Sequence, residues 1–300
     1  MVVAIIFIFS TIMKYDIDLT FFKNPQNIIA SIICIMIYCG LVYFNSYIWK
    51  IFLEIFSCKR IPIGKITAVY TKSNLAKYIP GNFMHFAGRN LLGSELGVTQ
   101  KQLAVSTFLE VFFLVGIGMI LSIILGGTQF FDIMLYYILQ LHVYLIGAIV
   151  IVFLSIACVF IVFVYNKRLV LLEYINMLWK ELIICLPKLL ILYTVSLLIP
   201  ALVLVYLLNW DSSLTIYRLS LIIPAYIISW IVGFIIPGAP GGLGIRESIL
   251  IVMLDQLYGG EKIVLAVILQ RLISIFGDVF AFLISVIQNR SNYASGKENG

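Results

Sequence analysis

Three ionisable side chains lie inside apolar stretches of the chain. Glu110 stands in STFLEVFFLVG, Arg271 in VILQRLISIFG and Asp278 in SIFGDVFAFL. A charge in the middle of a bilayer costs about 3 kcal/mol or more unless it is paired or hydrated, so such residues face the interior of a helix bundle. Two compatible interpretations follow: a structural ion pair, for instance between Arg271 and Glu110, or a polar path for a lipid headgroup or a proton.

Residues 66–98, ITAVYTKSNLAKYIPGNFMHFAGRNLLGSELGV, are too polar for a membrane span and too apolar for a plain loop. A Pro-Gly pair near the middle must break any helix there, which predicts two short helices. They form either an amphipathic hairpin at the membrane interface or a re-entrant pair that lines a polar cavity. The candidate site residues of this segment are Lys77, Tyr78, Pro80, Gly81, His85 and Arg89.

A second break, GFIIPGAPGGLGIRESIL, occupies residues 233–250 at the end of an apolar run. So many prolines and glycines cannot stay helical. The next helix is expected to start near Gly244, with Arg246 and Glu247 in its first turn, where the free N–H groups and the helix dipole suit an anion. The candidate site residues of this segment are Pro237, Gly238, Gly241, Gly242, Gly244, Arg246 and Glu247.

The two breaks resemble each other, since each has I-P-G followed several residues later by glycine and arginine. Interrupted apolar segments at corresponding places in two halves indicate a transporter binding site. The pattern predicts a parallel repeat of four spans each, over about 1–165 and 166–290. Arg89 and Arg246 are then expected to act together on one anionic headgroup.

The composition places these segments in a membrane. Hydrophobic residues make up 62% of the 300 residues, charged residues 11%, and the mean hydropathy is +1.10. Because soluble domains carry about 25% charged residues, a cytosolic enzyme, a secreted disulfide scaffold and a free nucleic-acid-binding domain are excluded. The net charge of +6 indicates basic cytoplasmic loops rather than a nucleic-acid partner.

The predicted fold is an all-α polytopic membrane protein with about eight transmembrane helices, in a single integral membrane domain over 1–290. A polar, disordered tail over 291–300 is expected to follow. The first span is short and lacks the basic start of a signal peptide, so we do not expect it to be cleaved. Apolar runs of spanning character occupy 1–13, 28–56, 102–125, 143–165, 188–208, 216–236, 244–258 and 262–288.

Lysine and arginine set the expected orientation. They gather in 57–101, in 166–188 and in the C-terminal tail, whereas 126–142 and 209–215 contain none. With both termini in the cytoplasm, every basic cluster lies on the cytoplasmic side of the cell membrane. If residues 237–260 re-enter the membrane instead of crossing it, the C-terminus is expected to lie on the other side.

Metal and redox chemistry have little support in the sequence. The five cysteines form no C-x-x-C pair, and there are only two histidines, so no cofactor or metal is expected. The spans also hold no clustered carboxylates of the kind that clamp a metal or share a proton. We therefore expect no catalytic residue and no enzymatic activity.

Taken together, these motifs resemble the transmembrane flippase region of the lysylphosphatidylglycerol synthetase/flippase family. The matching positions are Lys77 to Gly81 (K-Y-I-P-G), Arg89, Glu110, Pro237 to Glu247 (P-G-A-P-G-G-L-G-I-R-E) and Arg271. The resemblance covers about residues 28–288 and implies an eight-helix bundle with broken or re-entrant helices. It implies no aminoacyl-transferase activity, because the soluble transferase domain of the bacterial full-length proteins has no counterpart in this chain. Glu110 is followed by Val111, where the family often has arginine.

The functional hypothesis is a lipid flippase that moves a polar or anionic lipid, either a phospholipid or a lipid-linked saccharide, between leaflets. Arginines along the path would bind phosphate bidentately. One alternative is a non-catalytic membrane partner of a lipid or glycan biosynthesis enzyme, and a weaker one is an intramembrane transferase. The expected partners are membrane lipids, with lipid or glycan biosynthesis enzymes under the first alternative and no nucleic acid; the sequence leaves the oligomeric state open.

Overall fold

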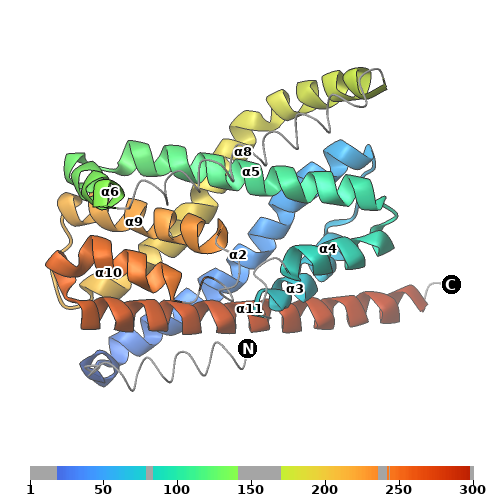
Figure 1. The fold of residues 1–300 in the computed structure, drawn as a ribbon. Coiled ribbons are helices and arrows are strands. Elements are labelled where there is room, and N and C mark those ends of the chain that lie inside the picture. The colour runs from blue at the N-terminus through green and yellow to red at the C-terminus, as the bar shows by residue number, and fades with distance from the viewer. Residues whose placement is uncertain (1–18, 79–83, 141–169, 236–241, 243, 298–300) are drawn as a thin grey trace.

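The computed structural model describes residues 19–78, 84–140, 170–235, 242 and 244–297, and every regular element among them is helical (Figure 1). Short 3-10 turns, η1 (Leu19–Lys23), η2 (Leu75–Tyr78) and η3 (Ser94–Leu96), link some of the helices. The α-helices are α2 (Pro25–Ser57), α3 (Ile63–Asn74), α4 (Met84–Gly93), α5 (Gln100–Leu125), α6 (Thr128–Gln140), α8 (Val170–Asn209), α9 (Ile216–Ile235), α10 (Ile245–Tyr258) and α11 (Gly260–Lys297).

Five helices in the described part of the chain are long and apolar enough to cross a membrane. They are Pro25–Ser57, Gln100–Leu125, Lys180–Asn209, Ile216–Ile235 and Gly260–Gln288, and they match five of the eight predicted spans. The predicted spans 1–13 and 143–165 lie outside the described residues. The count of eight therefore stays a prediction, while the helical fold of the described residues and five helices long and apolar enough to span a membrane are confirmed.

Local signals fix where several helices begin. Asn24 caps α2 by accepting a hydrogen bond from the Gln26 backbone N–H at 3.0 Å, and Pro25 occupies the first helical position, which lacks an intrahelical N–H partner in any case. Thr99 and Gln102 form a capping box at the start of α5. At the other end of the chain, α11 continues to Lys297, so residues 291–297 are helical where the sequence predicted disorder; no proline interrupts them.

Contacts between helices give their directions. We call the end of the bundle where α2 begins the Asn27 end and the end where α2 finishes the Ser57 end; they lie at the left and right of Figure 1. Tyr47 of α2 is hydrogen-bonded to Lys188 of α8 at 2.7 Å, and Asn27 of α2 is hydrogen-bonded to Tyr206 of α8 at 3.1 Å. These two helices are therefore antiparallel. The pairs Tyr38–Gln270 and Tyr43–Ala281, both at 3.1 Å, make α11 parallel to α2.

The first broken segment folds as a hairpin that enters the bundle from the Ser57 end. We call α3, η2 and α4 hairpin 1. It packs between the long helices, with Ile66 and Tyr70 buried in one apolar cluster with Trp49 of α2 and Leu103 of α5. This burial favours the re-entrant interpretation of residues 66–98 over a hairpin lying on the membrane surface.

The second broken segment forms hairpin 2, α9 and α10, which enters from the Asn27 end. Arg218 near the start of α9 and Tyr258 at the end of α10 both bond the side chain of Asn209, at 3.0 and 2.7 Å. Near its other end, Ile231 of α9 packs against Gly118 of α5, well short of where α5 begins. Hairpin 2 therefore turns back partway along the bundle (Figure 1).

This geometry corrects two expectations. The predicted span 244–258 is α10, a 14-residue helix of about 21 Å, which returns to the end from which α9 started. The broken segments enter from opposite ends, so their relation is inverted rather than parallel. The predicted span 216–236 is α9, which turns back with α10 instead of reaching the Ser57 end. Because α11 runs parallel to α2, it finishes toward the Ser57 end. The side of the membrane on which the C-terminus lies and the repeat of two four-span halves stay predictions.

Several members of two predicted basic clusters lie toward one end of the molecule. Lys59 and Lys101 flank hairpin 1, and Lys180 and Lys188 begin the apolar part of α8, all toward the Ser57 end. That asymmetry is the kind that the positive-inside rule describes. Which end faces the cytoplasm stays a prediction.

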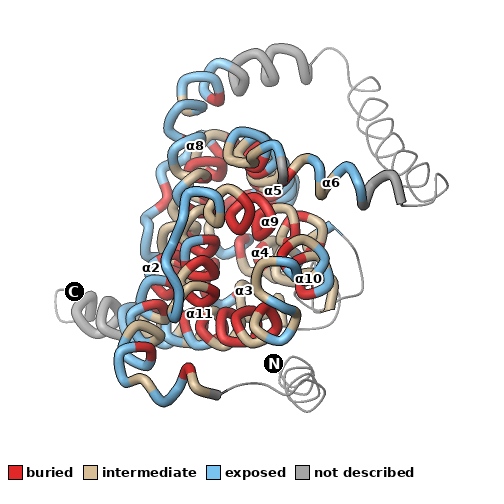
Figure 2. The backbone as a smooth tube through the Cα atoms, turned by 90° about the vertical axis from the view of Figure 1, so that its left-hand side faces the viewer, coloured by how far each residue is buried: buried red, intermediate tan, exposed pale blue. Residues whose placement is uncertain are grey.

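Burial shows which helices face lipid and which face inward. The apolar window of α11 is 67% buried, whereas that of α5 is only 22% buried. Large apolar side chains such as Ile29, Phe112 and Ile184 point outward and are more than half exposed. Figure 2 accordingly shows pale blue on the outer faces of α2 and α8 and red along the inner turns of α9 and α11.

Candidate functional site: a polar cavity between two hairpins

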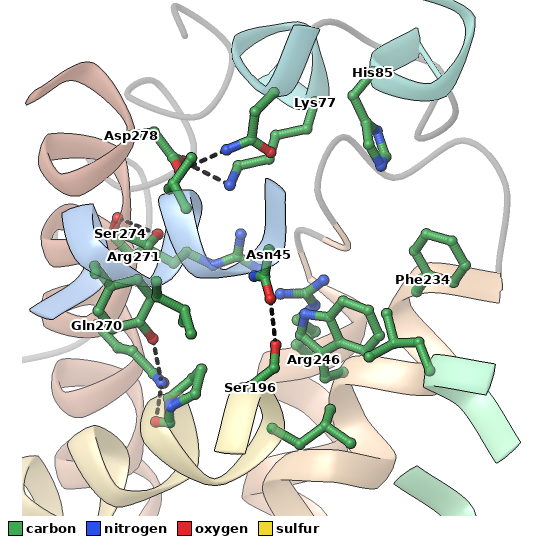
Figure 3. A pocket seen from close by; sticks show the side chains of 18 of the residues that line it. Asn45, Lys77, His85, Ser196, Phe234, Arg246, Gln270, Arg271, Ser274 and Asp278 are labelled. Atoms are coloured by element: carbon green, nitrogen blue, oxygen red, sulfur yellow. Dashed lines mark hydrogen bonds and ion pairs between the residues drawn. The ribbon is translucent and has the colours of Figure 1, made fainter. Parts of the chain in front are cut away.

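A cavity of about 260 Å³ lies where the inner ends of the two hairpins approach each other. Its walls come from both hairpins and from α2, α5, α8 and α11. Phe86 of hairpin 1 meets Phe234 of hairpin 2 edge-on at 5.7 Å between ring centroids. In an otherwise apolar bundle, this cavity gathers polar side chains at several depths (Figure 3).

One polar group joins hairpin 1 to α11. Asp278 accepts a hydrogen bond from Asn74 at 2.7 Å, bonds the Tyr78 hydroxyl, and pairs with Lys77 at 2.6 Å. Asp278 is 3% exposed and Lys77 about 30% exposed. A buried carboxylate with three partners is satisfied, so this cluster fastens the inner end of hairpin 1.

A second ion pair joins hairpin 1 to α5. Arg89 pairs with Glu110, and the two residues are 2% and 7% exposed. The guanidinium also lies 5.1 Å from the ring of Trp49 and 4.2 Å from that of Tyr70, at cation–π distance. The expected partnership of Glu110 with Arg271 is therefore wrong, because Arg89 reaches Glu110 from the re-entrant arm.

A third ion pair joins hairpin 2 to α11. Arg271 donates from Nε to Glu247 at 2.5 Å and from Nη2 to the carbonyl oxygen of Gly242 at 3.2 Å. Arg271 and Asp278 lie seven residues apart on α11, which is two helical turns. A single face of α11 therefore holds the inner ends of both hairpins, with opposite charges.

Arg246 differs from the other cations of the cavity. Within the described residues it has no carboxylate partner, and its Nε is buried without a hydrogen bond. Its guanidinium lies 5.5 Å from the ring of Trp230, which stacks on Phe234. The part of Arg246 that stays accessible lines the cavity.

Two glycines make room for the Arg246 side chain. A Cβ added to Gly233 would lie 2.7 Å from Cγ of Arg246, and one added to Gly242 would lie 2.8 Å from its Nε. Gly242 also has a φ of +72°, in the region that favours glycine. These glycines explain part of the unusual composition of the second break.

His85 lines the same cavity as a neutral side chain. Burial, together with the positive charges of Arg89 and Lys77, lowers the pKa of His85 from 6.5 to about 3. Its Nδ1 is buried and has no hydrogen-bond partner among the described residues. At neutral pH it therefore adds no charge to the cavity.

Uncharged polar residues complete the lining, and sequence reasoning missed them. Asn45 and Ser196 hydrogen-bond each other at 2.7 Å, and Gln270 donates to the Tyr38 hydroxyl and to the carbonyl oxygen of Pro200 at 3.1 and 2.7 Å. The sequence offers two signals for this lining: the amide of Gln270 stands next to Arg271, and Pro200 interrupts an apolar run.

Eight of the predicted site residues line the cavity: Lys77, Tyr78, His85, Arg89, Glu110, Arg246, Arg271 and Asp278. Glu247 and Gly242 contact Arg271, and Gly244, with φ +84°, caps α10 outside the lining. Arg89 and Arg246 do border one cavity, as expected, but they have different partners. The predicted site residues Pro80, Gly81, Pro237, Gly238 and Gly241 lie outside the described part of the chain.

Comparisons add no family to this geometry. A scan against protein-family models finds none that matches the chain, and no curated protein matches it. The resemblance to the lysylphosphatidylglycerol synthetase/flippase family stays a prediction from motifs. Among the described residues, no group of three His, Cys, Asp or Glu side chains could hold a metal ion.

Proposed function

We propose that the protein is a lipid translocase that moves a polar or anionic headgroup across the bilayer while the acyl tails stay in lipid. The observation that carries the proposal is the polar cavity between hairpins that enter from opposite ends of the bundle. Irregular backbone at membrane depth is tolerated where it lines such a cavity, and half-helix ends near the midplane are a common form of transporter binding site.

The arrangement supports passage of a headgroup from either side. Among the described residues, one ion pair fastens each hairpin to α11, Lys77–Asp278 for hairpin 1 and Glu247–Arg271 for hairpin 2. Because the hairpins enter from opposite ends, movement of one would connect the cavity to one leaflet and movement of the other to the second. The proposal assigns the protein no chemical step.

The test is lipid scrambling in vesicles that contain only the purified protein. A fluorescent phospholipid in the inner leaflet becomes reducible by external dithionite only if it is moved outward. We expect the Ser196→Phe variant, which fills the cavity, to lose scrambling. The matched control is Val195→Phe on the adjacent position, which is 36% exposed and does not line the cavity.

An unmodified protein that scrambles none of several phospholipids would refute the proposal. So would equal scrambling by the Ser196→Phe and Val195→Phe variants, because the cavity would then not be the path.

A further inference from the structure

The charges around the cavity do not balance. Among the described residues, four cationic side chains border it and three carboxylates form ion pairs with cations of this set. The cations are Lys77, Arg89, Arg246 and Arg271, and the carboxylates are Glu110, Glu247 and Asp278. Because each carboxylate is committed to another cation, the positive charge of Arg246 is the excess.

The inner ends of the hairpins cannot supply the missing charge. The residues between η2 and α4 are Ile-Pro-Gly-Asn-Phe, and those between α9 and Gly242 are Ile-Pro-Gly-Ala-Pro-Gly. Neither segment contains an acidic residue. A charge left uncompensated in a low-dielectric interior costs several kcal/mol, so the site is electrostatically suited to an incoming anion.

The surroundings of Arg246 suit an anion as well. Gly233 and Gly242 hold the stem of the side chain closely, which fixes the fork of the guanidinium. Arg246 also lies in the first turn of α10, whose cap, Gly244, offers no side chain to its N–H groups. A helix start adds partial positive charge and free donors, and a guanidinium binds phosphate oxygens bidentately.

We propose that the cavity binds one monoanionic phosphate group, the phosphodiester of a lipid headgroup, at Arg246, and that it discriminates against headgroups with net positive charge. This assignment rests on the proposed translocation for the lipid source of the phosphate. Lysylphosphatidylglycerol is among the headgroups it excludes, because the two ammonium groups of the lysyl ester outweigh the single phosphodiester charge.

The experiment measures binding to the purified full chain in detergent by titration calorimetry. The probes are dihexanoyl-phosphatidylglycerol, with one negative charge, dihexanoyl-phosphatidylcholine, which is zwitterionic, and lysylphosphatidylglycerol, which is net positive. Dimethyl phosphate represents a free phosphodiester. We expect the anionic lipid to bind at least tenfold more tightly than either other lipid, and dimethyl phosphate to bind much more weakly because it lacks the glycerol and acyl contacts.

Two variants locate the anion. Arg246→Gln should weaken binding of the anionic lipid about tenfold to a hundredfold, as expected for loss of charge-assisted hydrogen bonds, and should abolish the preference among lipids. Arg60→Gln makes the same chemical change at an exposed residue of the Ser57 end and should change nothing. Because Arg246→Gln removes an unpaired charge, its unfolding temperature without lipid should equal or exceed that of the unmodified protein, which separates lost binding from misfolding.

Each outcome decides a separate point. Equal binding of the anionic and zwitterionic lipids, or a preference that survives Arg246→Gln, would overturn the anion site whatever the scrambling assay shows. Dimethyl phosphate binding as tightly as the lipid would overturn the lipid source and leave a free-phosphate site. Selective binding of the anionic lipid without scrambling of any lipid would refute the translocation and retain the anion site.

Discussion

Hairpin 1 and hairpin 2 enter the same cavity from opposite ends, but they handle charge differently. Hairpin 1 brings two cations, Lys77 and Arg89, and each meets a carboxylate of a long helix. Hairpin 2 brings Glu247, which meets Arg271, and also Arg246, which meets none in the described chain. Both cavity-lining cations of hairpin 1 are thus paired with carboxylates, whereas one cation of hairpin 2 has no carboxylate partner among the described residues.

The difference teaches that an arginine inside the bundle can serve structure or binding according to its partner. Arg89 has a carboxylate and aromatic rings on its faces, so removal would leave a buried anion uncompensated. Arg246 lies against Trp230 and two close glycines and has no carboxylate partner among the described residues. We therefore expect the largest loss of stability in hairpin 1 and the largest loss of ligand binding in hairpin 2.

The largest expected effect is the loss of the Arg89–Glu110 pair. Arg89→Met should destabilise the protein by about 3–5 kcal/mol, because Glu110 would be left buried without a partner for its charge. Thermal unfolding of the purified protein in detergent measures this. Arg246→Met, the same substitution on hairpin 2, should cost little or should stabilise.

The double variant Arg89→Met/Glu110→Leu should recover most of the loss, because no unpaired charge remains. Equal shifts of the unfolding temperature for Arg89→Met and Arg246→Met would show that the contrast between the hairpins is not one of charge pairing.

The next effect concerns glycines. Gly242→Ala should cost about 1–3 kcal/mol, because its φ is +72° and the new Cβ would lie 2.9 Å from the carbonyl oxygen of Gly233. Gly88→Ala in hairpin 1 is the control, since its nearest neighbour, Cβ of Ser73, would lie at an ordinary 3.7 Å. Unfolding temperature and scrambling are both measured, and a Gly242→Ala variant as stable and active as Gly88→Ala would contradict the close packing around Arg246.

A smaller and local effect should follow from breaking either ion pair that joins a hairpin to α11. Asp278→Asn should speed amide hydrogen exchange in η2 and the end of α3 about tenfold, because Lys77 and Tyr78 lose their charged partner. The cost stays modest because Lys77 is partly exposed and can reach water. Glu247→Gln should do the same at the start of α10 and leave hairpin 1 unchanged.

Faster exchange in both hairpins after either substitution would show that they open as one unit, so α11 would not hold them independently. Mass spectrometry of peptides from η2 and from α10 distinguishes the two results.

Much of the helical fold was predictable because lipid demands long apolar runs with internal hydrogen bonds. The described spans of α2, α5, α8 and α11 follow from hydropathy alone. The depth at which α9 stops does not follow from hydropathy, because this mostly apolar helix of 20 residues satisfies the same length requirement whether it crosses the bilayer or turns back. The contact of α9 with Gly118 and the return of α10 to Asn209 depend on tertiary packing, which hydropathy does not show.

The site was predictable to the extent that charge is costly in lipid. That cost singles out Glu110, Arg271 and Asp278 within their apolar runs, and the proline–glycine breaks single out Arg89 and Arg246. The pairing was not predictable, because a sequence gives the charges but not the distances between them. Asn45, Ser196 and Gln270 were missed because an uncharged polar residue costs little free energy in a membrane span and can occur in any of them.

The smallest expected effect is a dependence on pH carried by His85 of hairpin 1. Its pKa in the fold is about 3 against an ordinary 6.5, because burial and the nearby cations disfavour the charged form. Below pH 6.5 the unfolded chain therefore binds a proton that the folded protein does not, and stability falls as the pH drops toward 3. The difference in unfolding temperature between pH 7 and pH 5 should be smaller in His85→Gln than in the unmodified protein. This window lies above the ordinary carboxylate range, and groups shared by both proteins cancel in the comparison. Identical pH profiles would mean that His85 reaches water in the fold, and hairpin 1 would then be less closed than its ion pairs indicate.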